Sequence, residues 1–441
     1  MNINKKTFQT HEGGKATFAT PMEQLKRSVL SCLLWEDTFY EDGVSIAERI
    51  SENVAKVTPE QAADVSLEAA NKRYLRHAPL WIAVSMLNTD DKEMWKHSYR
   101  IIPQIINRPD SIGELLALYR MKNTKRPLTN QMKKVLGETL SKFNEYSLAK
   151  NDKNSAAYSL QDIIRLTHPT PKNPEQNELF RKIAKKELET PVTWETLLSS
   201  GQDKKETFTQ LIKNKQLGGL AFLRNLRNMI QTGVEREVIE YGFETCSFKK
   251  IFPYQYIVAA RYAEDYKKQL EKIMIKDLEE KEKLPGETIL LIDKSGSMSC
   301  GVSAKSEMSC YDYAKALAIL MKEITQKSVI YTFNNEIELV KESRGFELEE
   351  NMGYPDGGTY MWGSISEVKE KHPEAERIIV LTDEQTADYE IEENKKYPHQ
   401  YIINLASYQN GVSYKPDWIH IDGFSQAVID YIQEYEKQFS N

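Results

Sequence analysis

Carboxylate and hydroxyl side chains occur together in three short segments in the last third of the chain. They are Asp-Lys-Ser-Gly-Ser at 293–297, Asp-Gly-Gly-Thr at 356–359 and Leu-Thr-Asp at 381–383. Their oxygen atoms are hard donors, which Mg²⁺, Mn²⁺ and Ca²⁺ prefer and which suit zinc poorly. Gly296 permits the tight backbone that turns both serine hydroxyls towards one point. The sequence therefore predicts one divalent-cation site (Mg, Mn or Ca) whose ligands are Asp293, Ser295, Ser297, Thr359 and Asp383.

The first of these segments has a second explanation, because Asp and Ser are also favoured N-caps of helices. Three segments in the expected order favour the cation site over a helix cap. Lys294 stands between two of the ligands, so we expect occupancy to depend on ion supply and pH. Hydrolysis by a bound metal is not expected, because these segments contain no histidine as a general base and Glu384 is only a remote candidate.

An apolar run at 288–292 stands directly before Asp293, and another at 377–381 is separated from Asp383 by Thr382 alone. Two further runs occupy 328–333 and 400–405, and residues 316–324 show the apolar spacing of a helix. Short apolar runs that alternate with helices are typical of a parallel or mostly parallel sheet covered on both faces. In such α/β sheets, ligands bind beyond the carboxyl ends of the strands. The segments at 293–297 and 381–383 stand at such strand ends, and Thr359 stands on a turn that its glycines permit.

The chain before the charged run at 276–286 is predicted to be helical. From Met22 to about Met274, apolar residues recur at helical spacing, and the connections are polar and marked by proline. The Pro-Gly pair that closes the charged run is the best domain boundary, so we predict two domains, residues 1–282 and residues 285–441. Many helices of this kind favour a stacked α-solenoid or a helical ring. No clean sequence repeat indicates how the helices pair.

Charge is divided unevenly between these two parts. From Leu284 onward, 14 Lys and Arg stand against 27 Asp and Glu, a net charge of −13, whereas the preceding residues carry a net charge of +7. Any nucleic acid is therefore expected to meet the N-terminal part. A surplus of this size is also compatible with an ordinary solvated surface.

The remaining composition indicates a cytoplasmic protein. The start of the sequence does not resemble a signal peptide, and no apolar run approaches the ~18 residues needed to span a bilayer. We therefore expect no membrane partner. Cys32, Cys246, Cys300 and Cys310 show no zinc-ligand spacing, and reduced thiols are expected.

The three oxygen-rich segments resemble the metal-ion-dependent adhesion site of von Willebrand factor A domains. With motifs spread over the rest of the chain, they make the sequence similar to the Ro family, also called TROVE-domain proteins, and to its bacterial or phage-type members. The motifs are His11-Glu-Gly-Gly-Lys-Ala16 with Leu25-Lys-Arg27, Asp162-Ile-Ile-Arg-Leu-Thr-His168, Leu220-Ala-Phe-Leu-Arg-Asn-Leu-Arg-Asn-Met229 with Gly233-Val234, Phe252-Pro-Tyr-Gln-Tyr256 and Thr382-Asp383-Glu384.

This resemblance implies a multidomain protein with an all-α ring of HEAT-like repeats and a C-terminal α/β, Rossmann-like von Willebrand A domain. It implies RNA binding without catalysis. Small noncoding RNAs of the Y type would lie on a basic outer surface, and the 3′ ends of misfolded RNA would enter the central hole. An exoribonuclease or an RNA-repair protein is an expected partner, and the chain is expected to be a monomer.

Basic residues that could contact RNA phosphates gather in the predicted helices. Phosphate binding needs Lys and Arg on one face. Lys133 and Lys134 are the better candidates, although a solvated helix face explains them equally well, and His168 before Pro169 is better explained as a helix cap. The predicted RNA contacts are Lys125, Arg126, Lys133, Lys134, Lys142, Arg165 and His168.

Two other functions compete with RNA binding. The first is a metal-dependent scaffold that binds proteins and no RNA, which a neutral or plugged hole would favour. The second is a nuclease, which is disfavoured because no cluster of acidic residues for two metals is visible in the helical part.

Overall fold

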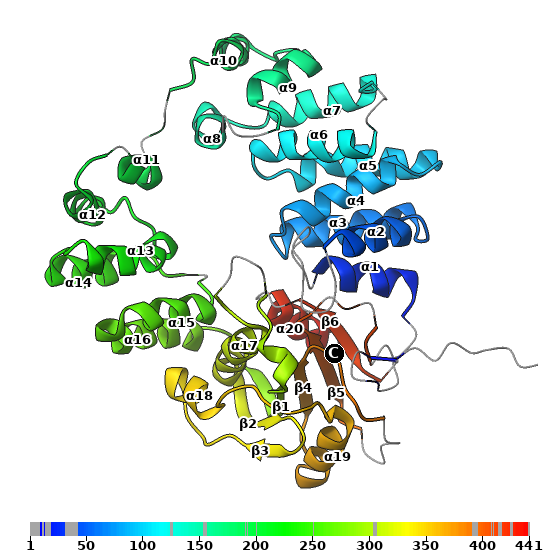
Figure 1. Ribbon diagram of the computed structural model, residues 1–441, viewed down its shortest axis with the longest axis vertical. Helices are drawn as coiled ribbons and strands as arrows, with labels where there is room; N and C mark the ends of the chain where they lie inside the picture. Colours follow the sequence, from blue (N-terminus) through cyan, green and yellow to red (C-terminus); the bar gives the residue numbers. More distant parts are fainter. Residues whose placement is uncertain are drawn as a thin grey trace, which may run out of the picture. The chain divides into compact units, whose positions relative to one another are not determined.

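The computed structural model describes residues 9–10, 13, 19–30, 43–123, 127–152, 157–189, 191, 193–199, 201–249, 251–302, 307–389, 396–406, 408, 410–412, 417–423 and 427–439 (Figure 1). The chain forms two compact units. We call Ala19–Asp37 with Glu41–Val192 the helical unit, and Met1–Phe18, Thr38–Tyr40 and Thr193–Asn441 the sheet unit. The predicted division between residues 282 and 285 stays a prediction.

The described part of the helical unit consists of helices joined by short connections. They are α1 (Pro21–Leu30), α2 (Gly43–Val54), α3 (Pro59–Asn71), α4 (His77–Leu87), α5 (Lys92–Ile105), α6 (Asp110–Lys122), α7 (Asn130–Leu140), α8 (Glu145–Asn151), α9 (Leu160–Thr167) and α10 (Pro174–Lys185). Local sequence fixes several of their starts. Thr58 and Gln61 form a reciprocal capping box at the start of α3, and Asp91 caps α5 through the main-chain N–H of Glu93.

The helices of this unit stack in two layers. In one layer α1, α3, α5, α7 and α9 pack against one another in succession, and in the other α2, α4 and α6 do so. Within each of these series a helix thus packs against the helix two places further along the chain, as in proteins built from helical repeats. Apolar side chains fill the space between them, and buried Trp81 of α4 donates its indole N–H to Ala47 O of α2 at 2.8 Å. A closed HEAT-like ring stays a prediction.

The sheet unit begins with six further α-helices and a short 3₁₀ helix. They are α11 (Trp194–Ser199), α12 (Lys204–Lys213), α13 (Gly219–Gln231), α14 (Arg236–Thr245), α15 (Pro253–Tyr262), η1 (Glu264–Tyr266) and α16 (Lys267–Glu279). After Glu279 the chain enters the first strand within five residues. The predicted change from a helical to an α/β pattern at this point is confirmed.

One sheet of six strands follows, in the order β3-β2-β1-β4-β5-β6. The strands are β1 (Leu284–Asp293), β2 (Thr325–Phe333), β3 (Ile337–Leu339), β4 (Arg377–Thr382), β5 (His399–Asn404) and β6 (Ile419–Asp422). Every neighbouring pair is parallel except β2 and β3, which are antiparallel. Each of the four predicted apolar runs lies mostly or wholly in a strand, so the predicted mostly parallel sheet is confirmed.

Helices cover both faces of this sheet. They are α17 (Cys310–Ile324), α18 (Gly345–Asn351), α19 (Met361–Lys371) and α20 (Ala427–Phe439). Successive residues of β1 point to opposite faces. Leu290 therefore joins the apolar cluster that contains α17, while Ile289 joins the cluster that contains Trp362 of α19.

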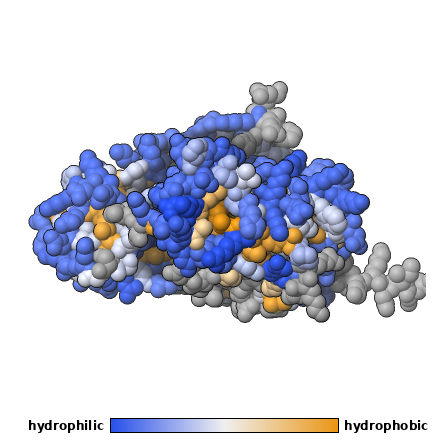
Figure 2. Space-filling view, turned by 90° about the horizontal axis from the view of Figure 1, so that it is seen from above, coloured by the Kyte–Doolittle hydropathy of each residue, from blue (hydrophilic) through white to orange (hydrophobic). Residues whose placement is uncertain are grey.

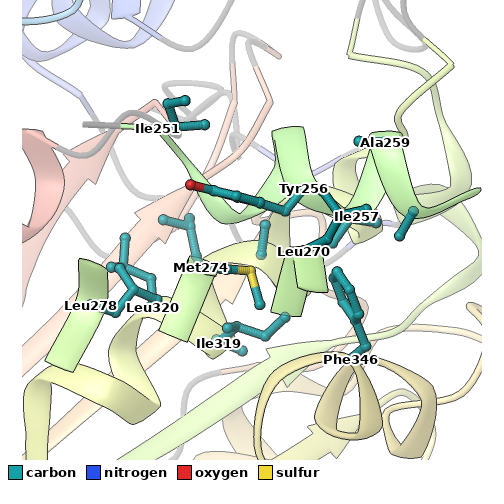
Figure 3. Packing of buried hydrophobic residues seen from close by; sticks show 14 of the residues in the cluster. Ile251, Tyr256, Ile257, Ala259, Leu270, Met274, Leu278, Ile319, Leu320 and Phe346 are labelled. Carbon is teal, nitrogen blue, oxygen red and sulfur yellow. The ribbon is translucent and has the colours of Figure 1, made fainter. Parts of the chain in front are cut away.

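Hydrophobic packing is continuous between the last helices before the sheet and the helices that cover it. Figure 3 shows Tyr256 of α15 with Leu270 and Met274 of α16 beside Ile319 of α17 and Phe346 of α18. All five are nearly inaccessible to solvent. α15 and α16 therefore share one core with the sheet.

Hydrophilic residues cover most of the face seen in Figure 2, with hydrophobic residues gathered in smaller patches. Among the described residues, no helix has both the length and the apolar composition that a bilayer-crossing segment requires.

Candidate functional site

The candidate site lies where the order of the strands reverses. β1 is flanked by β2 on one side and by β4 on the other, and connections to the two sides run in opposite directions. Such a switch point opens a crevice beyond the carboxyl ends of the strands. Asp293 is the last residue of β1, and Asp383 directly follows β4. Both predicted carboxylates therefore stand at the switch point.

A chain of hydrogen bonds joins four of the five predicted ligands. Asp293 Oδ1 accepts the main-chain N–H of Ser295 at 2.8 Å, and the hydroxyl oxygens of Ser295 and Ser297 lie 3.2 Å apart. Ser297 donates its hydroxyl to Asp383 Oδ2 at 2.7 Å. The structure thus brings together side chains that are 90 positions apart in the sequence. Asp293 and Asp383 are inaccessible to solvent.

The loop that carries Thr359 is bound to both other segments. Gly296 donates its N–H to Gly357 O at 3.0 Å, and Asp356 donates its N–H to Lys294 O at 2.7 Å. On the other side, Thr359 O accepts the hydroxyl of Thr386 at 3.1 Å. Gly357 has a φ of +72°, a conformation that glycine adopts at little cost. Thr359 is therefore a buried residue between the two aspartate segments.

Two negatively charged carboxylates buried side by side cost free energy unless a cation offsets their charge. Burial, and next the negative charge of Asp383, raise the pKa of Asp293 from its ordinary 3.8 to about 7. Hydrogen bonds from Ser295 and from Thr382, whose hydroxyl lies 2.6 Å from Asp293 Oδ2, oppose this shift. The ammonium of Lys294 pairs instead with Glu338 at 2.5 Å.

The donor set fits a hard divalent cation. It offers carboxylate and hydroxyl oxygens from three loops, and a cation would offset the repulsion between the two aspartates. Within the described residues, no group of three or more His, Cys, Asp or Glu is arranged to hold a metal. A cation at the switch point would therefore depend on the serine and threonine hydroxyls as well as on the aspartates.

A second buried polar cluster, which sequence analysis did not find, lies beside this site. Glu384 is inaccessible and has a φ of +61°, and its carboxylate contacts Nε2 of His420 in β6. His420 Nδ1 lies 3.5 Å from Asp422 Oδ2, and Asp422 in turn accepts the side-chain N–H of Asn404 at 2.9 Å. The available signal was a polar residue at the end of each of β4, β5 and β6. The strand order that assembles these residues is not visible in the sequence.

The predicted RNA contacts lie in the helical unit, in different surroundings. Lys134 is 70% exposed and lies 4.0 Å from Glu138, whereas Lys133 is half-buried. Arg165 is exposed on α9, and exposed His168 ends that helix with a φ of +47°. The helix-cap explanation of His168 agrees with this geometry. Lys125 and Arg126 lie outside the described residues.

Lys142 has a structural role in its described surroundings. Its ammonium donates to Pro103 O at 2.7 Å and also contacts Ile106 O, at the last turn of α5. A cation at this position satisfies carbonyl groups that have no partner within the helix. Burial lowers the pKa of Lys142. Its ammonium therefore contacts protein carbonyls, and its predicted contact with RNA stays a prediction.

Comparison with known proteins finds a family model that matches part of the chain. Residues 184–300 match the family model of the TROVE domain. This segment is similar to the TROVE domain. The matched segment runs from the end of α10 to the turn after β1, so it includes three of the predicted cation ligands, Asp293, Ser295 and Ser297. The resemblance to the Ro, or TROVE-domain, family is confirmed.

The fold of this chain is shared with a solved structure. The crystal structure of the Ro (RSR) protein of Deinococcus radiodurans is 14% identical and superposes with a TM-score of 0.65. The likeness covers 94% of this chain and 99% of that chain. At this identity it establishes a common fold. A search of curated proteins finds no match.

Proposed function

We propose that this TROVE-domain protein binds RNA without chemically altering it. The observation that carries the proposal is the TROVE match over residues 184–300 in a chain whose fold is that of a Ro protein over 94% of its length. By the Ro resemblance, its ligands are small noncoding RNAs of the Y type and the 3′ ends of misfolded RNA. Its role is RNA quality control or processing in the cytoplasm, as a monomer that works with an exoribonuclease or an RNA-repair protein.

The division of charge supports this proposal. The part of the chain before Leu284 carries a net charge of +7, whereas the rest carries −13. RNA phosphates are attracted to the first part and repelled by the second, and this attraction weakens as salt rises. In the proposed assembly, HEAT-like repeats form a ring that carries the RNA.

Crosslinking, followed by sequencing of the RNA that copurifies from the protein's own host, tests this function directly. We expect enrichment of a small structured RNA at low salt and at physiological salt. Recovery of no enriched RNA under either condition would contradict the proposal. Substitution of both Lys133→Glu and Lys134→Glu should weaken RNA binding with little loss of stability. Unchanged affinity would place the RNA surface elsewhere.

For the sheet unit we propose a von Willebrand A-type cation site. Asp293, Ser295, Ser297, Thr359 and Asp383 would bind Mg²⁺, Mn²⁺ or Ca²⁺ directly or through water. A bound cation would supply a positive charge with one position open to an acidic group of a partner protein. The protein residues themselves hold the three loops together and keep bulk water away from Asp293 and Asp383, which are inaccessible to solvent.

The alternative function, a protein scaffold without RNA, rests on this cation site alone. A pull-down with the full chain in Mg²⁺ and in EDTA separates the two functions. A protein partner that is retained only with Mg²⁺, in the absence of any bound RNA, would favour the scaffold.

A further inference from the structure

A cavity of about 650 Å³ lies on the surface of the helical unit, between α5 and α7. This volume is within the range of small-ligand sites. α5 supplies most of the lining, and Gln131, Val135 and Glu138 of α7 supply the rest. None of the predicted RNA contacts lines the cavity, although Lys134 lies 4.0 Å from Glu138 at its wall.

Two side-chain rows run along the wall that α5 forms. Lys92, Lys96 and Arg100 follow one another at intervals of four residues, and Trp95 and Tyr99 follow at the same interval. Residues four apart lie on the same face of a helix, about 6 Å further along its axis. A cationic row and an aromatic row therefore lie side by side. Each aromatic residue directly precedes a cation, so the pair is repeated after one turn.

Both rings are held by hydrogen bonds at their polar ends. The indole N–H of Trp95 donates to Thr89 O at 2.8 Å, and 37% of the residue is exposed. The hydroxyl of Tyr99 lies 3.0 Å from that of Thr129. Because the polar atoms already have partners, the exposed parts of the rings are available for stacking. Because both rings are already held in place in the free protein, binding a ligand costs less side-chain entropy.

The cations in the cavity are largely available. All three are exposed, and in the described part of the chain neither Lys92 nor Arg100 forms an ion pair. Lys96 lies 2.5 Å from Glu93, but both side chains are more than half exposed, and such pairs contribute little. The carboxylate of Glu138, on the opposite wall, lies 4.0 Å from Lys134.

We propose that this cavity binds single-stranded RNA, with successive bases on Trp95 and Tyr99 and the phosphates beside Lys92, Lys96 and Arg100. The inference rests on the proposed RNA-binding function and adds a site to it. Bases stack on aromatic side chains whatever their identity, and a basic groove follows the backbone. The repeated aromatic–cation pair matches the alternation of base and phosphate along a strand. An acidic peptide would use the cations but would leave the rings without planar partners.

The test measures binding of a fluorescein-labelled oligoadenylate to the full chain by fluorescence anisotropy. We expect Trp95→Ala with Tyr99→Ala to weaken binding about 10-fold or more, since each lost stack is worth several-fold. Trp95→Phe keeps a ring and should restore most of the affinity in that position. Lys92→Gln with Arg100→Gln should lower the slope of log affinity against log salt by about 1.4, for two lost phosphate contacts.

Matched controls distinguish failure of the cavity site from failure of the proposed RNA-binding function. Tyr74→Ala removes an aromatic residue that is 83% exposed and outside the cavity, and binding should not change. If the double alanine variant is folded by circular dichroism and binds the oligonucleotide as tightly as the wild type, the cavity site is wrong and the proposed function stands. If the wild type binds no RNA even at low salt, the proposed function fails. A polyglutamate probe that binds more tightly than RNA, and loses affinity in the same variants, would overturn RNA as the occupant.

Discussion

The hydroxyl of Ser297 donates a hydrogen bond of 2.7 Å to Asp383 Oδ2, across 86 positions of sequence. This bond joins the turn after β1 to the end of β4, the two elements on either side of the switch point. The hydroxyl oxygen and the carboxylate oxygen are close enough to serve one ion, and rotation of the hydroxyl proton would free both.

The first prediction concerns the cation. We expect millimolar Mg²⁺ or Mn²⁺ to raise the melting temperature of the wild type, because an ion that binds only the folded state stabilises it by mass action. At a concentration about 100 times the dissociation constant, the gain is about 2.7 kcal/mol. Asp383→Asn removes one of the two charges and should abolish most of that gain. Differential scanning calorimetry with Mg²⁺ and with EDTA measures it.

Asp417→Asn is the matched control, because Asp417 is an exposed aspartate of the same unit that pairs with Lys396 at 2.6 Å. Its metal-dependent shift should equal that of the wild type. Equal shifts in Asp383→Asn and in the wild type would show that the cation does not bind at the switch point.

The second prediction concerns pH. The pKa of Asp293 is raised from 3.8 to about 7 by burial and by Asp383, so between these values the folded chain holds a proton that the unfolded chain releases. Without cation, this group should therefore lower the free energy of unfolding as pH rises from about 4 to 7. Stabilisation by Mg²⁺ should increase over the same range, because deprotonated Asp293 binds the ion. Urea unfolding at pH 5.5 and pH 8, with and without Mg²⁺, measures both effects.

The variant Asp293→Asn has no titrating group at this position. Its comparison with the wild type therefore measures how much this carboxylate contributes to the pH dependence of the unfolding free energy. Its unfolding free energy should depend less on pH between 4 and 7 than that of the wild type in EDTA. An identical pH dependence in the two proteins would assign the effect to other groups.

The third prediction concerns a buried ion pair that ties α20 to the start of β4. Arg377 donates through Nε to Glu436 Oε1 at 2.8 Å and through Nη1 to Pro285 O at 2.7 Å. Both members of the pair are almost inaccessible. Removal of one partner leaves a buried charge unpaired, so Arg377→Ala should lower the unfolding free energy by about 3–5 kcal/mol. Chemical denaturation monitored by circular dichroism measures the loss.

An exposed pair in the same unit gives the comparison. Lys396→Ala removes the partner of Asp417 at the surface and should cost less than about 1 kcal/mol. A similar cost for both variants would contradict the importance of burial for the pair that Arg377 forms.

The fourth prediction concerns two thiols. The sulfur atoms of Cys300 and Cys310 lie 3.2 Å apart, and Cys310 donates its main-chain N–H to Cys300 O at 2.9 Å. We expect hydrogen peroxide to join them: the two thiols lose two protons and two electrons, one S–S bond forms, and the peroxide is reduced to two waters. Because Cys300 is the more exposed, it is expected to react first, and Cys310 then closes the disulfide. Peptide mass spectrometry detects the bond.

Cys246 provides an internal control. Burial raises its pKa to about 11, so it should remain a thiol under the same treatment. Formation of mixed products at Cys246 before any bond between Cys300 and Cys310 would contradict the expected selectivity.

The mostly parallel sheet was predictable from the sequence, because its central strands contain continuous apolar runs. Asp293 and Asp383 are found at the ends of two of these strands, beside each other as the parallel arrangement requires. Contacts that depend on tertiary packing were not predictable. The carbonyl partners of Lys142 belong to another helix, and His420 meets Glu384 only because β6 and β4 flank β5. A basic or polar residue looks the same in sequence whether it faces solvent or a neighbouring carbonyl.

The described N-terminal segment has a consequence for the order of folding. Thr10 donates its hydroxyl to Thr386 O at 2.6 Å, although 376 positions separate them, and the helical unit lies in the chain between the parts of the sheet unit. During synthesis, the stacked helices can complete their local contacts early. The hydrogen bond of Thr10 can form only after β4 and Thr386 have been synthesised. Closing so long a loop is entropically costly and favours slow folding. We therefore expect the helical unit to become resistant to protease on the ribosome before the sheet unit does.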